Sequence, residues 1–203
     1  MAQLTDGLFL HDILLMVLGS LLFLVLLGGL IARMARNEPV ERRMQLFFVL
    51  PALMIAYPGT QRLAFSNGVL ELEKRTEEVL QNPLDTSAVR YLDEQLNKVE
   101  LRPVRSANAL EATAKAQYVS GHPEAALVTS EKILRRNPEN PAAAAVKKLV
   151  FLDKLETALS MNPTDTLARE KYLETIQALG ESSEVWVQQE MSARSKLLQY
   201  PGR

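Results

Sequence analysis

The twenty residues Ile13–Ala32, ILLMVLGSLLFLVLLGGLIA, contain no charged side chain. At a rise of about 1.5 Å per residue, a helix of this length spans about 30 Å, the thickness of a bilayer's hydrocarbon core. Fourteen of the residues are Leu, Ile, Val or Phe, and at about −0.3 to −0.6 kcal/mol each they contribute roughly −4 to −8 kcal/mol to insertion. The stretch is apolar on every side, whereas a buried helix of a soluble protein would show an apolar stripe. It therefore predicts a transmembrane helix.

The residues that flank this helix predict its orientation. The preceding segment, MAQLTDGLFLHD, holds no Lys or Arg, which argues against a cleaved signal peptide because such peptides begin with positive charge. Loops rich in Lys and Arg stay in the cytoplasm. We therefore expect the N-terminus outside and the Arg-rich side inside. The Arg residues that follow the helix are Arg33, Arg36, Arg42 and Arg43, and the acidic residues before it are Asp6 and Asp12.

A second apolar stretch, QLFFVLPALMIAYPGTQRLAF at Gln45–Phe65, raises the question of a second crossing. Its most apolar part, Leu46–Tyr57, contributes only about −2 to −4 kcal/mol to insertion, and Pro51 removes one helix hydrogen bond. As the second arm of a hairpin it is held at the interface by the first helix, and Arg62 can extend to the far surface.

The sequence favours this hairpin, with helices at 13–32 and 45–65 inside a membrane anchor at 1–66. The domain at 67–203 then lies outside the cytoplasm, which in a bacterium is the periplasm. The alternative is an interfacial second segment, which leaves that domain in the cytoplasm.

Beyond Phe65 the chain predicts an all-α domain. Apolar residues recur three and four positions apart, no stretch alternates as a strand would, and Gly and Pro fall between the periodic segments. The inward positions expected of the successive helices include Leu72 and Val79, Leu92 and Leu96, Leu110 and Ala114, Ala126 and Ile133, Val146 and Leu149, Ala168 and Leu179, and Trp186.

The breaks between these helices repeat. Asn-Pro occurs at Asn82, Asn137 and Asn162, and the two sites NPLDTSA and NPTDTLA are nearly identical. Pro ends a helix because the residue before it avoids the helical conformation, and an Asp or Thr just beyond can cap the next helix. This punctuation predicts antiparallel helices stacked in order.

Between Ala107 and Pro138 the sequence resembles a tetratricopeptide repeat. Leu110 and Ala114 fall on the first helix of the repeat, Gly121 at its turn and Ala126 at the small-residue crossing point, and the segment ends in Leu-Arg-Arg-Asn-Pro. The aromatic residue near the start of the family's pattern is replaced by Leu110, and the next unit, from Pro138 to Pro163, is short at 25 residues. The resemblance implies stacked helix pairs that bind a peptide segment of a protein partner.

A membrane hairpin followed by an external tetratricopeptide region also resembles the layout of the membrane-anchored cytochrome c maturation assembly factors. The likeness is one of architecture, and those proteins usually have a longer cytoplasmic loop. It implies a scaffold or assembly factor in the bacterial inner membrane. The alternative is an integral subunit of a larger membrane complex, whose hairpin packs against the helices of its partners.

Composition excludes several other classes of function. The net charge is −1 and no long run of one sign occurs, so we expect no nucleic acid partner. The absence of Cys excludes thiolate metal sites and thiol catalysis, and the two His residues, His11 and His122, form no HExxH motif. No GxGxxG, P-loop or GxSxG motif is present. We expect no enzyme, no cofactor and no metal site.

Two sets of residues are candidates for binding. On the first helix of the repeat, residues spaced three and four positions apart lie on one face, beside the core stripe. This face predicts a partner-binding surface made of Asn108, Glu111, Lys115 and Tyr118. The alternative for this face is a solvated surface with a Glu111–Lys115 pair. In the membrane helix, Gly28 and Ala32 form a small-xxx-small step that can pack against another membrane helix. The membrane lipid itself is the other expected partner.

Overall fold

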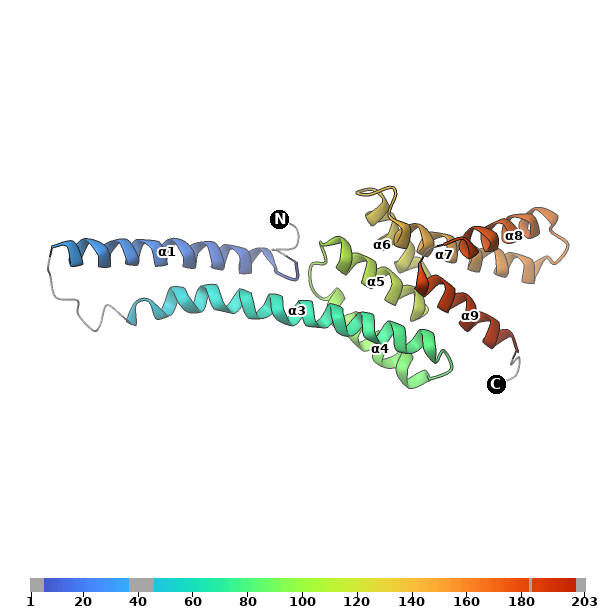
Figure 1. The fold of residues 1–203 in the computed structure, drawn as a ribbon, viewed down its shortest axis with the longest axis horizontal. Coiled ribbons are helices and arrows are strands. Elements are labelled where there is room, and N and C mark those ends of the chain that lie inside the picture. Colours follow the sequence, from blue (N-terminus) through green and yellow to red (C-terminus); the bar gives the residue numbers. More distant parts are fainter. Residues whose placement is uncertain (1–5, 37–45, 183, 200–203) are drawn as a thin grey trace. The chain divides into compact units, whose positions relative to one another are not determined.

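The computed structural model describes residues 6–36, 46–182 and 184–199 (Figure 1). The chain divides into two compact units. The N-terminal unit comprises Met1–Asn67 together with the short segment Arg102–Arg105, and the C-terminal unit comprises Gly68–Leu101 and Ser106–Arg203.

The fold of the described residues is all-α, as the sequence predicts, with eight helices and no strand. The helices are α1 (Leu10–Ala35), α3 (Val49–Gln81), α4 (Thr86–Glu100), α5 (Ala107–Val119), α6 (Pro123–Leu134), α7 (Pro141–Met161), α8 (Thr166–Gly180) and α9 (Val185–Gln199).

The first helix, α1, contains the predicted membrane segment and extends it by three residues at each end, to 26 residues. In the described residues it is the one helix whose length and apolar composition alone suffice for a membrane crossing. Large apolar side chains along it, such as those of Leu14, Leu18, Leu21 and Val25, are exposed. An exposed apolar surface of this size is typical of a membrane-interaction or protein-interaction site.

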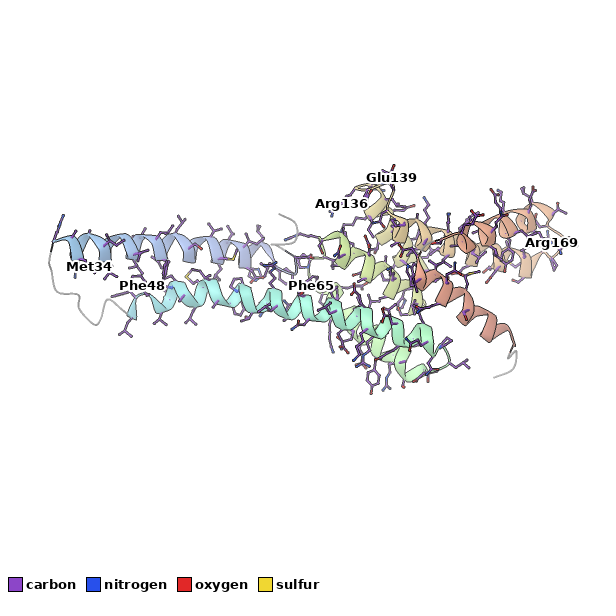
Figure 2. All side chains as sticks on the ribbon, viewed as in Figure 1. Met34, Phe48, Phe65, Arg136, Glu139 and Arg169 are labelled. Atoms are coloured by element: carbon purple, nitrogen blue, oxygen red, sulfur yellow. The ribbon has the colours of Figure 1, made fainter. Side chains whose placement is uncertain are left out.

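Within the N-terminal unit, α1 runs antiparallel to the first part of α3. The Phe23 ring meets the Phe48 ring edge-on at a centroid distance of 5.5 Å. Gly19 lies so close to Met54 that a Cβ added to the glycine would stand 2.8 Å from the Met54 Cβ. In Figure 2, Phe48 lies toward the C-terminal end of α1, where Met34 is labelled, and Phe65 lies toward its N-terminal end.

The second predicted helix, at 45–65, does not end at Phe65, because α3 continues without a break from Val49 to Gln81. Gly68 stays helical inside it, and a Cβ at that position would lie 3.6 Å from the Val99 side chain of α4. Pro51 costs no hydrogen bond, since it lies in the first turn, where N–H groups lack helical partners in any case. Pro58 is the proline inside the helix. Arg42, Arg43 and Gln45 lie outside the described residues.

The C-terminal unit is a series of antiparallel helices. Helix α4 packs against α5, α5 against α6, α6 against α7, and α7 against α8, while α5 also contacts α7. The second half of α3 packs on α4, where the Arg75 guanidinium lies 5.9 Å from the centre of the Tyr91 ring. The predicted inward positions are buried, among them Leu72, Leu92, Leu110, Ala126, Val146, Leu149 and Leu179.

The three Asn-Pro corners have one shared geometry. At each, the asparagine N–H closes the preceding helix by donating to the carbonyl four residues earlier, at 3.0, 2.9 and 2.9 Å. The residue three positions later donates its own N–H back to the asparagine carbonyl, as in a turn with Pro at its second position. That later residue also caps the next helix with its side-chain oxygen: Asp85 for α4, Asn140 for α7 and Asp165 for α8.

The turn between α5 and α6 forms a second kind of corner, at the predicted Gly121. The Gly121 N–H donates to the Tyr118 carbonyl at 3.1 Å, and the His122 N–H donates to the Gln117 carbonyl at 2.8 Å. This pair of bonds is a Schellman motif, which needs a left-handed residue after the helix. Gly121 fills that position with a φ of +88°.

Candidate functional site

A pocket of about 350 Å³ lies between the second half of α3 and α5, inside the C-terminal unit. Three of the four predicted binding residues line it: Asn108, Glu111 and Lys115. The opposite wall comes from α3. The remaining lining residues are Glu73, Thr76, Glu77 and Ala112.

The fourth predicted residue, Tyr118, does not line this pocket. Its side chain is buried, with only 6% of the residue exposed, and its hydroxyl lies 3.3 Å from Asp153 Oδ1 on α7. Helix α5 packs on α7 as well as on α6, and Tyr118 lies on the side of α5 that faces Asp153 of α7. The geometry therefore makes Tyr118 part of the core.

Glu111 is held in place by the α6–α7 corner. Its Oε1 accepts a hydrogen bond of 2.7 Å from the amide nitrogen of Asn140, whose own Oδ1 caps α7. The carboxylate therefore keeps a defined position at the pocket wall. The outer side of this corner carries Arg136 and Glu139 (Figure 2).

Lys115 is turned toward the start of α9. Its Nζ lies 3.8 Å from Glu184 Oε2 and 5.4 Å from the centre of the Trp186 ring. The Trp186 indole N–H also donates to Glu184 Oε2, at 3.1 Å. Sequence reasoning assigned Trp186 to the core and missed Glu184, because no spacing rule relates α5 to residues seventy positions later.

On α3, four glutamates divide into two pairs. Glu71 and Glu78 each bind the guanidinium of Arg75, at 2.8 and 2.7 Å, and the hydrogen bond to Glu78 is the main cause that raises the pKa of Arg75. Glu73 and Glu77 line the pocket instead, with no ion-pair partner among the described side chains.

The membrane-packing residues show a different outcome. Gly28 and Ala32 are exposed, and a Cβ added to Gly28 would meet nothing within 4 Å in the chain. Gly19 is the glycine at which α1 and α3 approach most closely, and its neighbours are Met54, Ile55 and the Pro51 carbonyl. The spacing rule did not single out Gly19, because it has no small residue four positions away.

In the described part of the chain, no three His, Asp or Glu side chains converge as metal ligands would. No protein-family model matches this sequence, and neither a curated protein nor a solved structure is significantly similar to it.

Proposed function

We propose that this chain is a non-enzymatic, membrane-anchored scaffold or assembly factor of the tetratricopeptide type. It binds a segment of a protein partner in the pocket between α3 and α5. The observation that carries the proposal is the convergence of Asn108, Glu111 and Lys115, chosen from the repeat pattern, on one cavity. The antiparallel α5–α6 pair supports it, with Gly121 at its turn and the fully buried Ala126 on α6.

The charges of the pocket indicate the chemistry of the partner. Glu73, Glu77 and Glu111 are acidic, and the one cation of the lining, Lys115, is drawn toward Glu184. Glu73 and Glu77 stand four apart on one helix, and such like-charged pairs destabilise a helix by about 0.2–0.5 kcal/mol. A partner segment that carries Lys or Arg would relieve this repulsion. Asn108, which is exposed, can bond the backbone of that segment.

The proposed location is the bacterial inner membrane, with the C-terminal unit on the periplasmic side. The exposed apolar surface of α1 supports membrane insertion, and Arg33 and Arg36 at its end support a cytoplasmic turn. The antiparallel contacts of α1 with residues 48–55 support a hairpin anchor.

The test is recovery of a partner by the full chain in mild detergent, followed by mass spectrometry. Glu77 lines the pocket and has no ion-pair partner among the described side chains. Reversing its charge in Glu77→Lys should therefore lower partner recovery by about tenfold, as loss of a binding hot spot does. Glu94→Lys, on the exposed surface of α4, carries the same charge change outside the pocket and should bind as the wild type does. Equal recovery by both variants would remove the pocket from the proposal.

A second function is favoured by the exposed Gly28 and Ala32 on α1. A small-residue step open to lipid suits close packing against a foreign membrane helix, as an integral subunit of a larger complex would require. Replacing residues 1–66 by an unrelated membrane hairpin separates the two functions. A scaffold that binds through its pocket keeps its partner after this replacement, and an integral subunit loses it.

A further inference from the structure

Two segments that are far apart in sequence meet within the N-terminal unit. The Gly7 N–H donates a hydrogen bond of 3.0 Å to the Pro103 carbonyl, and the Arg105 N–H donates one of 2.7 Å to Asp6 Oδ1. Beside them, the Arg102 guanidinium donates to the backbone carbonyl and to the side-chain oxygen of Gln61 on α3. We call this arrangement of residues 6–8 and 102–105 the clasp.

The clasp is packed as well as hydrogen-bonded. Asp6 and Leu8 are 7% and 1% exposed, and Phe65 of α3, which contacts this segment, is 5% exposed. Gly7 has a φ of +72°, and a Cβ at this position would overlap the Phe65 side chain. Only glycine meets both requirements, since other residues rarely adopt that φ and would overlap the ring. The contact is therefore specific.

The position of the clasp along the chain restricts how the chain crosses a membrane. Residues 6–8 precede α1, whereas residues 102–105 follow both α3 and α4. If α1 alone crossed the bilayer, these segments would lie on opposite sides of a hydrocarbon core about 30 Å thick. Hydrogen bonds of 2.7–3.0 Å require them on the same side. The number of crossings between them is therefore even.

We propose that the first half of α3 returns across the bilayer, and that the clasp locks this two-pass anchor by joining its beginning to the chain that leaves it. The inference rests on the part of the proposed function that places α1 in the membrane. Helix α3 has the length for it, since its 33 residues extend about 50 Å. Between Val49 and Phe65 its one charged residue is Arg62, which can extend to the interface.

Since the natural chain has no cysteine, single introduced thiols report the crossings. His11→Cys, Arg36→Cys and Asn67→Cys each replace an exposed residue and are treated in intact cells with a membrane-impermeant maleimide. Two crossings give His11→Cys and Asn67→Cys the same labelling, opposite to that of Arg36→Cys. Asn67→Cys labelled like Arg36→Cys and unlike His11→Cys would overturn the inference and leave the anchor in place. Equal labelling of all three would overturn the membrane anchor as well.

The clasp itself is tested by trypsin cleavage after Arg105, followed by mass spectrometry, on the full chain in lipid nanodiscs. Gly7→Ala should open the clasp and speed this cleavage by about tenfold or more, because cleavage follows the population of the open form. Gly29→Ala, at an α1 position where an added Cβ meets nothing within 4 Å, should cleave at the wild-type rate.

A second pair of variants separates the clasp from general unfolding. Asp6→Ala removes the acceptor and should also speed cleavage after Arg105, whereas Asp6→Asn keeps an acceptor oxygen and should have a much smaller effect. Cleavage after the exposed Arg169 is the internal reference in every sample. The clasp is supported if cleavage accelerates at Arg105 alone. Equal acceleration at Arg169, or wild-type rates at Arg105 in Gly7→Ala and Asp6→Ala, would overturn it.

Discussion

The Asn140 side chain joins Glu111 to the start of α7 by using both ends of its amide. Its Nδ2 donates to Glu111 at 2.7 Å, and its Oδ1 accepts from the Ala143 N–H at 2.9 Å. The equivalent positions at the other two Asn-Pro corners are Asp85 and Asp165, which can cap a helix but cannot donate. Asparagine at this corner therefore caps α7 and also donates to Glu111 of α5, which aspartate could not do.

We expect Asn140→Asp to destabilise the protein although aspartate is an equally good cap. The variant places two carboxylates at hydrogen-bond distance in a site where residue 140 is only 7% exposed, and loss of a hydrogen bond to a charged group costs about 1.5–3 kcal/mol. Chemical denaturation followed by circular dichroism measures the change. Adding Glu111→Gln should restore most of the stability, and a double variant as unstable as Asn140→Asp would contradict this account.

Gly19→Ala should weaken the contact between α1 and α3. Its Cβ would lie 2.8 Å from that of Met54, and excess volume in a packed interface costs about 1–3 kcal/mol. Cross-linking of Phe23→Cys to Phe48→Cys by a short bismaleimide, at the two positions whose rings lie 5.5 Å apart in the native chain, reports the contact. The yield should fall with Gly19→Ala and stay unchanged with Gly28→Ala. Equal yields in both backgrounds would show that the approach at Gly19 does not hold the pair together.

The start of α4 should lose stability in acid. The Ser87 hydroxyl and the N–H groups of Ala88 and Ser87 donate to Asp85, which lowers the pKa of this carboxyl below its ordinary value. Because the pKa is lower in the folded state, the ionised carboxyl stabilises the fold at pH values above the pKa of Asp in the unfolded chain, about 3.9. This contribution is lost as the pH falls toward the pKa of Asp85 in the folded chain.

The comparison that isolates this effect is with Asp85→Asn, which caps without titrating. The wild type should be the more stable protein at about pH 6, and the difference in denaturation midpoint should shrink as the pH falls through about 4. A difference that does not change with pH would show that the ionised carboxyl of Asp85 adds nothing beyond capping.

Alkaline carbonate should leave the protein in the membrane fraction. The treatment releases proteins held by charge, whereas α1 has an apolar surface long enough to span the hydrocarbon core. Sedimentation and immunoblotting of the full chain measure this, with a chain that begins at Gly68, and so lacks α1, as the comparison. Recovery of the full chain in the supernatant would exclude an integral anchor.

The local features of the fold could be predicted from the sequence because they depend on neighbours in the chain. Apolar spacing identifies the core of every helix from α4 to α8, and the Asn-Pro motif identifies Asp85 and Asp165 as caps. The continuity of α3 could not be predicted, since Ser66-Asn67-Gly68 lowers helix propensity and the contact of Gly68 with Val99 of α4 joins positions far apart in the chain.

The candidate site was predictable on one side only. The α5 wall follows from a repeat pattern, but the α3 wall, with Glu73 and Glu77, depends on which helix faces α5 in three dimensions. The same limit explains Tyr118, which the helical spacing places with Asn108 and the packing of α7 places in the core. It also explains the clasp, where Asp6 and Arg105 are 99 positions apart.

The Asn-Pro corners also bear on how such a chain can change in evolution. Each corner ends one helix and begins the next with hydrogen bonds that span at most four positions. The geometry of these bonds therefore depends on a short, continuous stretch of sequence. A duplication that copied a helix together with its corner would bring a complete junction into the new place. The number of helices in the C-terminal unit can therefore grow or shrink by recombination without a redesign of the connections.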